Sequence, residues 1–279
     1  MRIRTTSTQR TYRYVRVTIL AATLLLIVAV AVQSVTGGVP ASLSAAYYTP
    51  AGPMFVSALF VVAAAFLALS GRSIEQGLLD VAAVLALAVA VVPTTVESEV
   101  CGPAGRCVPS AVVPTVVNNG IAVASVVYVG VLAALVLARV QGTLSRGVLL
   151  TAGSVGVVAT GFLLWALVAP DAFLALAHNA AAVAFFLLIG AVAALAAWRP
   201  QREPQRFRPA YAAVAVGILF ALAGLGATLV AAALGADTTV PVPWVFLGEA
   251  VALVLFAAFW VLQTVELWDD PDPRLRAGT

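Results

Sequence analysis

The sequence predicts an all-α fold, a polytopic transmembrane bundle of about eight helices with both termini in the cytoplasm. Three observations predict it. Of the 279 residues, 62% are hydrophobic and 10% are charged, whereas a soluble domain is about half apolar and about a quarter charged. The mean hydropathy is +1.06. Apolar stretches recur along the whole chain, and the arginines are divided unevenly between the connections.

Each predicted span has the length that a membrane helix needs, roughly 20 residues for a hydrocarbon core of about 30 Å. The spans cover residues 17–35, 51–69, 77–92, 120–138, 148–168, 173–197, 210–234 and 244–265, so we expect a single transmembrane domain over residues 1–279. The third span is the shortest and carries Asp80 near its start, which leaves seven spans as an alternative. Residues 93–119 form the one long connection.

The arginines set the orientation. With eight spans both termini share one side of the membrane, and that side holds every arginine except Arg106. Because cytoplasmic loops are enriched in arginine, we expect the termini to be inside and the protein to lie in the cell (cytoplasmic) membrane. The basic start of the chain then belongs to an uncleaved first helix. The net charge of +3 reflects this topology, so we expect no nucleic acid partner.

The composition also excludes several kinds of chemistry. The chain has no lysine, which excludes a Schiff base and a P-loop. One histidine and two cysteines cannot supply a four-cysteine zinc site or haem ligation by two histidines. We therefore expect neither a metal site nor a cofactor, and an enzyme is the less favoured reading.

The long connection carries the string CGPAGRC, in which Cys101 and Cys107 flank a Gly- and Pro-containing reversal. On the outer face of the membrane this pair is expected to form a disulfide. The spacing favours a structural link over a redox-active pair, which more often has the form CxxC. With the opposite orientation the pair would face the cytoplasm and be reduced.

Another outer segment, residues 37–53, contains Tyr47 and Tyr48 before a proline turn. Two adjacent tyrosines at the mouth of a span are typical of an interfacial aromatic belt. They would equally suit the lip of an outward-facing pocket.

Polar residues inside the spans are the main site candidates, because they are costly in a bilayer unless paired or hydrated. His178 and Glu249 each lie five residues into a predicted span, about 7 Å deep, on helices that run in the same direction. The two side chains could therefore meet, and the neighbouring Asn118, Asn119 and Asn179 could join them. One reading is a polar clasp between helices, and the other is a cavity that binds a ligand headgroup or carries a proton.

Asp80 is the remaining intramembrane charge. It lies close to the inner boundary, so it either reaches the cytoplasmic interface or has a functional role. Glycines in the fifth and seventh spans predict close helix approach there. They are Gly153, Gly156, Gly161, Gly217, Gly224 and Gly226.

Four strings in the sequence carry a resemblance to a known family. They are SLSAAYYTPAGPMFVSAL (42–59), LLDVAAVLALAVAVVPT (78–94), HNAAAVAFF (178–186) and FLGEAVALVLFAAFW (246–260). Together they resemble an uncharacterised family of bacterial, especially actinobacterial, polytopic integral membrane proteins, and the layout is loosely similar to DRAM-like proteins. The resemblance implies recurring residues at positions 47–50, Asp80, His178 and Glu249. It also implies six spans in the commoner form and a basic residue where this chain has Gly52 and Pro53, and it carries no established activity.

These observations favour a non-enzymatic integral membrane protein that binds or moves a small lipid or amphipathic ligand through an outward-facing polar pocket. His178, Glu249, Tyr47 and Tyr48 would line that pocket, and membrane lipid would be the partner. A structural or assembly subunit with a membrane protein partner is one alternative. The other is a membrane hydrolase or transferase that uses His178 and Glu249.

Overall fold

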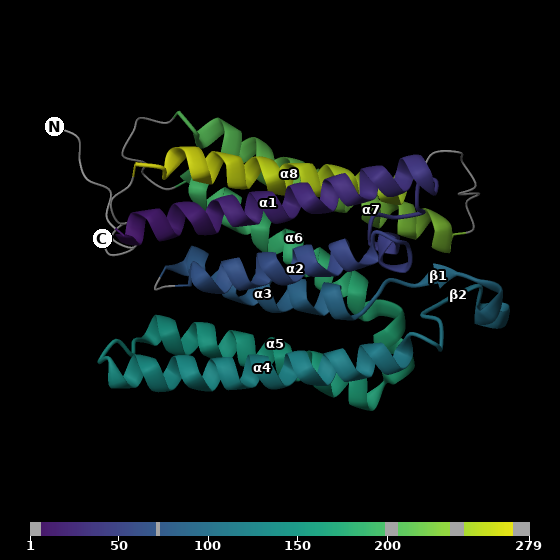
Figure 1. Ribbon diagram of the computed structural model, residues 1–279, viewed down its shortest axis with the longest axis horizontal. Coiled ribbons are helices and arrows are strands. Elements are labelled where there is room, and N and C mark those ends of the chain that lie inside the picture. The colour runs from purple at the N-terminus through teal and green to yellow at the C-terminus, as the bar shows by residue number, and fades with distance from the viewer. Residues whose placement is uncertain (1–6, 71–72, 199–205, 235–242, 270–279) are drawn as a thin grey trace.

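The computed structural model describes residues 7–70, 73–198, 206–234 and 243–269. These residues form eight α-helices, two short 3₁₀ helices (η1 and η2) and a two-stranded antiparallel β-hairpin (Figure 1). The order is α1 (Ser7–Thr36), η1 (Ser44–Tyr48), α2 (Gly52–Ala68), α3 (Ile74–Val91), β1 (Val96–Glu97), η2 (Glu99–Ala104), β2 (Arg106–Cys107), α4 (Val113–Val140), α5 (Arg146–Val168), α6 (Pro170–Trp198), α7 (Arg208–Ala233) and α8 (Trp244–Glu266).

The helices indicate a multi-pass membrane protein. Seven of those described are long and apolar enough to cross a membrane, and the eighth, α2, has 17 residues. At 1.5 Å per residue α2 is about 26 Å long, close to the thickness of a hydrocarbon core. Figure 1 shows α2 lying lengthwise beside α1 and α3 like the longer helices. Eight lengthwise passes bring the start of α1 and the end of α8 to the same end of the bundle.

The predicted spans agree with the helices, with two corrections. The shortest of the eight α-helices is α2, with 17 residues, and not the third helix, which has 18. The connection predicted over residues 93–119 ends early, because α4 begins at Val113. Pro114 at the first turn of α4 explains this start, since proline has no amide hydrogen to lose there. The short β-hairpin in the same connection was not predicted.

Local sequence explains where several helices begin and end. Ser73 caps α3 in a capping box with Gln76, in which each side chain bonds the backbone of the other residue. Ser145 caps α5 by accepting the amide hydrogen of Val148 at 3.3 Å. The α3 helix ends at Val91 because Pro93 follows and cannot donate to the helix.

The hydrophobic core lies between α1, α2, α3, α6, α7 and α8. At its centre Phe66 is fully buried, with its ring centroid 5.4 Å from that of Trp260 and 6.2 Å from those of Phe185 and Phe256. The four rings come from α2, α6 and α8, so this contact joins three helices that are far apart in sequence.

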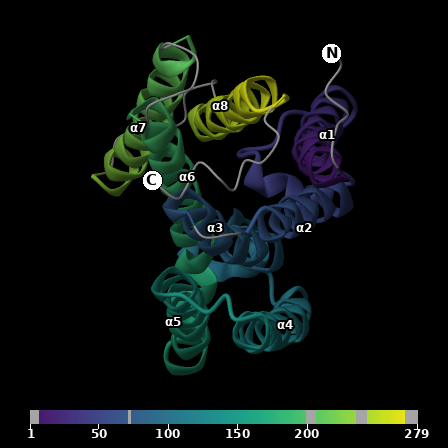
Figure 2. The same ribbon diagram turned by 90° about the vertical axis from the view of Figure 1, so that its left-hand side faces the viewer.

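The α4–α5 helix pair lies outside this core. It packs on α3 and α6 at one edge of the bundle (Figure 2). Each of the two helices has only two buried residues, Val116 and Ala138 in α4 and Val155 and Ala159 in α5. The pair is therefore held by a narrow contact, and the rest of its apolar surface faces outward.

The glycines also differ in how closely a neighbouring helix approaches them. A Cβ atom at Gly217 would lie 3.0 Å from Leu255, so α7 approaches α8 closely at this position. The five other glycines for which close approach was predicted, at positions 153, 156, 161, 224 and 226, have nothing within 4 Å of such an atom. That prediction is wrong for these five, because the faces that carry them have no packed neighbour among the described residues.

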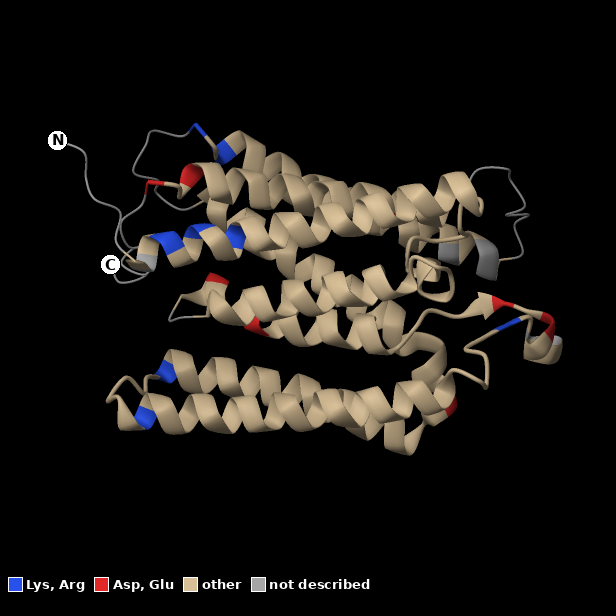
Figure 3. Cartoon of the chain, in the orientation of Figure 1, with Lys and Arg blue, Asp and Glu red and all other residues tan. Residues whose placement is uncertain are grey.

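Charge is divided between the two ends of the bundle (Figure 3). We call the end formed by the start of α1 and the end of α8 the Arg-rich end, and the opposite one the Arg-poor end. The described arginines at the Arg-rich end are Arg10, Arg13, Arg16, Arg139, Arg146, Arg206 and Arg208. Arg106 is the only basic residue of the described part of the chain at the Arg-poor end, where it lies 3.3 Å from Glu97.

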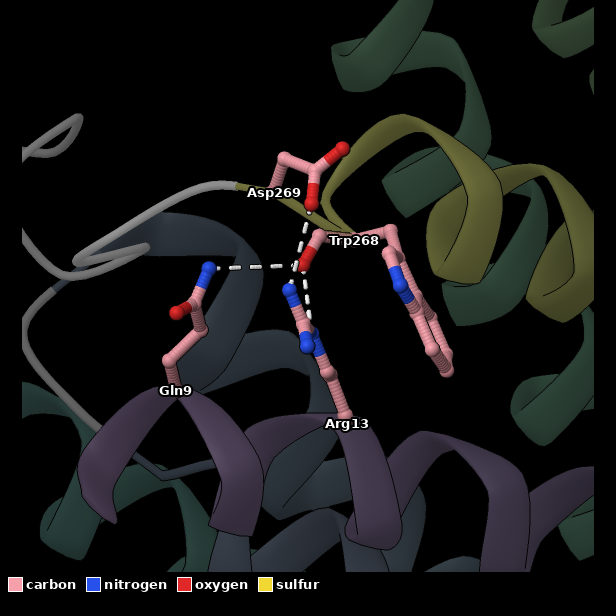
Figure 4. A network of polar contacts seen from close by, with 4 residues as sticks. All are labelled: Gln9, Arg13, Trp268 and Asp269. Atoms are coloured by element: carbon pink, nitrogen blue, oxygen red, sulfur yellow. Dashed lines mark hydrogen bonds and ion pairs between the residues drawn. The ribbon is translucent and has the colours of Figure 1, made fainter. Parts of the chain in front are cut away.

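The first and last helices are joined at the Arg-rich end (Figure 4). Arg13 donates from Nε to the carbonyl oxygen of Trp268 at 2.6 Å and from Nη2 to Asp269 at 3.2 Å. Its guanidinium also lies 4.7 Å from the centre of the Trp268 ring. Gln9 donates to the same carbonyl at 3.5 Å. This contact closes α1 onto α8.

Candidate functional site at the Arg-poor end

The residues singled out in the sequence lie mostly at the Arg-poor end. Four backbone segments meet there: the end of α3, the connection from α1 to α2 that contains η1, and the N-terminal parts of α6 and α8 (Figure 1). Each of the main candidate side chains bonds one of these segments, as the following contacts show.

His178 lies in α6 with 2% of its surface exposed. Its Nδ1 is 2.7 Å from the carbonyl oxygen of Val92, the C-cap residue directly after α3. The last carbonyls of a helix have no partner in their own helix, and the imidazole supplies one here. His178 therefore fixes the end of α3 to α6.

This contact also fixes which nitrogen of the neutral ring carries the hydrogen. A carbonyl oxygen only accepts, so Nδ1 carries the hydrogen and Nε2 of the neutral ring is an acceptor. Nε2 has no hydrogen-bond partner in the described part of the chain, although it is buried. The residues beside this contact, Val92 and Ala177, belong to a small apolar cluster with Val116. Packed against that cluster are Val112, Phe162, Trp165, Phe173 and Leu174.

Glu249 bonds the connection that contains η1. One carboxyl oxygen accepts the Ser44 amide hydrogen at 3.1 Å, and the other accepts the Ser44 hydroxyl at 3.0 Å. Leu43, which precedes η1, makes no side-chain cap. A carboxyl group from α8 thus caps a 3₁₀ helix that is distant in sequence, and it holds the connection to the bundle.

Tyr48 links the same connection to the end of α3. Its hydroxyl donates to the carbonyl oxygen of Thr94 at 2.8 Å, two residues beyond the carbonyl that His178 binds. The Tyr47 and Tyr48 rings meet edge to face with centroids 5.2 Å apart. Burial raises the pKa of both hydroxyls, and the neighbouring Tyr47 adds to the rise at Tyr48. Tyr48 is therefore a neutral donor at physiological pH.

These contacts connect His178 and Glu249 through the backbone and not directly. The series runs from Glu249 to Ser44 in η1, from Tyr48 to Thr94, and from Val92 to His178. In the described part of the chain no hydrogen bond or ion pair joins the two side chains. The direct meeting that the sequence suggested is not formed, because each group has a backbone donor or acceptor of its own.

The three candidate asparagines make no hydrogen bond with the His178 or Glu249 side chain among the described residues. Asn118 and Asn119 are exposed in the second turn of α4, where the first donates to the second at 3.2 Å. Asn179 follows His178 and is half-buried. Sequence reasoning placed the first two at the outer start of a span, whereas α4 begins five residues earlier than Asn118. That they bind a ligand stays a prediction.

Asp80 lies toward the other end of the bundle. It is 5% exposed, and its Oδ2 accepts the Ser70 hydroxyl at 2.7 Å, while Oδ1 has no partner among the described residues. Ser70 directly follows the C-cap residue of α2 and Asp80 lies in α3, so the contact links these two helices. Whether Asp80 reaches the cytoplasmic interface or has a functional role stays a prediction.

Sequence reasoning missed a polar group at the Arg-rich end. Tyr211, which is fully buried at the start of α7, donates to Glu266 in the last turn of α8 at 2.7 Å. Arg16 is buried in α1, and its guanidinium is 5.9 Å from the Tyr12 ring. The available signal was that Tyr211 and Glu266 fall at the same end of adjacent antiparallel spans.

The cysteine prediction is confirmed. Cys101 and Cys107 form a disulfide with their Cα atoms 5.5 Å apart. The bond closes the β-hairpin beyond the end of the bundle, where Val96 pairs with Cys107. Positive φ angles at Gly102 and Gly105 make the reversal between the strands possible.

Comparisons with protein-family models, with curated proteins and with solved structures find no match to this chain. The described residues contain no group of three or more histidine, cysteine or acidic side chains that could hold a metal ion.

Proposed function

We propose that this protein is a multi-pass protein of the cytoplasmic membrane that binds or moves a small lipid or other amphipathic ligand near the Arg-poor end. One observation carries the proposal: Nε2 of His178 is a buried acceptor with no partner among the described residues. Buried polar atoms nearly always have a partner, and those without one often belong to functional sites. The apolar cluster that contains Val92 and Ala177, the residues next to this imidazole, supports a ligand with an apolar body.

The orientation is part of the proposal. The concentration of arginines at one end supports placing that end, and with it both termini, in the cytoplasm. The ligand site would then lie in the outer half of the membrane, and the disulfide would face an oxidising compartment. A fluorescent protein fused to the C-terminus should be fluorescent, and alkaline phosphatase fused at the same place should be inactive. The opposite pair of results would reverse the orientation.

Within this proposal the candidate residues have two different roles, ligand contact and positioning of the backbone. His178 contacts the ligand, while Glu249 and Tyr48 hold the connection and the end of α3 in place through Ser44 and Thr94. This division follows from their partners: the carboxyl and hydroxyl groups are engaged, whereas one imidazole nitrogen is not.

The membrane hydrolase alternative receives less support from this arrangement. It requires Glu249 to orient His178, and in this structure Nδ1 of the ring faces Val92 while the carboxyl group faces Ser44.

Lipid retention tests the binding proposal. The wild type, purified from membranes in mild detergent, should keep a lipid that is detected by native mass spectrometry, and His178→Leu should lose it. Thr23→Val is the matched control. Thr23 is buried in α1 and bonds only the carbonyl of Ile19 in its own helix, so this change removes a buried hydroxyl elsewhere. Equal lipid occupancy in the wild type and His178→Leu would refute the proposal.

A further inference from the structure

The direction of the hydrogen bond at His178 limits what its other nitrogen can bind. Because Nδ1 donates to the Val92 carbonyl, Nε2 offers a lone pair and no hydrogen. A ligand group at Nε2 must therefore be a donor. Carboxylates and phosphodiesters have only acceptors, so they cannot fill this position while the ring is neutral.

The charges at the Arg-poor end also favour a neutral ligand group. The described acidic residues there are Glu97, Glu99, Asp171 and Glu249, against the single basic residue Arg106. Arg106 is paired with Glu97 on the exposed hairpin, away from the helices. An anionic headgroup would thus meet no available cation near His178 among the residues that the structure describes. A cationic headgroup would have to be buried in an apolar cluster, and this costs far more than burying a neutral hydroxyl.

We propose that the ligand of His178 is a neutral lipid with a free hydroxyl group, whose hydrogen is donated to Nε2 while its hydrocarbon body lies against the apolar cluster around Val92, Val116 and Ala177. This inference rests on the proposed function and names its ligand class. A diacylglycerol has the required chemistry: one hydroxyl, no charge and two acyl chains.

Access to the site follows from how weakly α4 and α5 are attached. The apolar cluster beside His178 is covered by Val116 from α4 and by Phe162 and Trp165 from α5. These two helices bury few residues against the rest of the bundle. Elements with few buried contacts open at low free-energy cost, so separation of the α4–α5 pair from α3 and α6 would open a path from the lipid to this apolar cluster and the imidazole beside it.

The chain contains a single histidine, so its imidazole nitrogens can be observed without ambiguity. We would label the full-length protein with ¹⁵N-histidine, place it in lipid nanodiscs, and record the two nitrogen resonances. The expected spectrum has a protonated Nδ1 and an unprotonated Nε2. Adding 1,2-dioleoylglycerol should shift Nε2 and leave Nδ1 nearly unchanged. A protonated Nε2 in the starting spectrum would overturn the inference.

Ligands matched to dioleoylglycerol make the test specific. Its acetyl ester lacks the hydroxyl hydrogen, phosphatidic acid with the same chains adds negative charge, and the corresponding amine adds positive charge. Dioleoylglycerol should bind about tenfold more tightly than the acetyl ester, as expected for one buried hydrogen bond. Equal binding of the ester, or preferred binding of the acid or the amine, would overturn the ligand class and leave the proposed function intact. Binding of none of the four lipids would refute the proposed function itself.

A variant can separate ligand binding from folding. In His178→Asn the side-chain amide nitrogen takes the place of Nδ1 and can still donate to Val92, whereas nothing takes the place of Nε2. This variant should fold and lose the tenfold preference for the free hydroxyl. Thr23→Val should keep it. A preference that persists in folded His178→Asn would overturn the assignment of Nε2 as the acceptor.

Discussion

The contact between Glu249 and Ser44 makes the sharpest prediction about stability. The change is Glu249→Leu, alone and combined with Ser44→Ala. In the wild type the carboxyl group accepts both the amide and the hydroxyl hydrogen of Ser44, at 3.1 and 3.0 Å. Removing the carboxyl group leaves two donors of a buried residue without an acceptor. Removing only the hydroxyl leaves the amide bond intact.

The magnitudes follow from these bonds. A buried donor left unpaired costs roughly 1–3 kcal/mol, so the two donors left by Glu249→Leu should lower the free energy of unfolding by about 2–6 kcal/mol. Ser44→Ala loses one hydrogen bond to the carboxyl group, which is worth about 1–2 kcal/mol. In the double variant the lost hydroxyl bond is counted once only. The coupling energy between the two sites should therefore be about 1–2 kcal/mol.

The assay is unfolding of the purified protein from mild detergent by increasing SDS, followed by tryptophan fluorescence. Glu97→Leu is the control at the same end of the bundle, since the Glu97 side chain is 77% exposed, and it should change stability little. Hydrogen exchange adds a local readout, because the amide of Ser44 should exchange faster in Glu249→Leu. Additive effects of the two substitutions would show that the carboxyl group does not bond the Ser44 hydroxyl, and unchanged exchange of the Ser44 amide would show that it does not bond the amide.

Three further predictions concern other parts of the bundle. Arg13→Ala should destabilise the protein by about 1–2 kcal/mol in the same SDS assay, because its partly buried guanidinium bonds the Trp268 carbonyl. Asp269→Ala should have almost no effect, since that carboxylate is 93% exposed. Equal effects of the two substitutions would contradict the greater weight given to the carbonyl contact. Phe66→Ala should lower the free energy of unfolding by about 3–5 kcal/mol, because it leaves a cavity in the aromatic cluster. Phe220→Ala, on the outward face of α7, should lower it little. Similar melting temperatures for these two variants would refute the central position of the aromatic cluster. Reduction of the disulfide that closes residues 101–107 should lower stability by about 2 kcal/mol and let an impermeant maleimide label the thiols from outside; labelling only from inside would reverse the orientation.

The fold could be predicted from the sequence to a large extent. Membrane helices are long and apolar over their whole length, so their number and approximate bounds can be read from hydropathy alone. The disulfide could be predicted for a similar reason: both cysteines lie in one short segment, and no distant contact is needed to bring them together. Errors occurred where helix ends depend on single residues, as at the start of α4.

The packing of the helices could not be predicted. Glycine-rich faces predicted close approach in the fifth and seventh spans, yet only Gly217 is closely approached. A small residue permits a close contact, but it does not decide which neighbour is there to make it. The narrow attachment of the α4–α5 pair is likewise a property of the assembled bundle.

The candidate site shows which of its features can be predicted from the sequence and which cannot. The sequence by itself determined which residues are costly in a bilayer, namely His178, Glu249 and Asp80, because an ionisable group in an apolar span is visible without any structure. Only the tertiary structure decided their partners: the carbonyl of Val92, the amide and hydroxyl of Ser44, and the hydroxyl of Ser70. Two of these three partners involve backbone groups, which every residue has. Sequence can identify a side chain that needs a hydrogen-bond partner, but the fold alone brings one particular carbonyl or amide within reach.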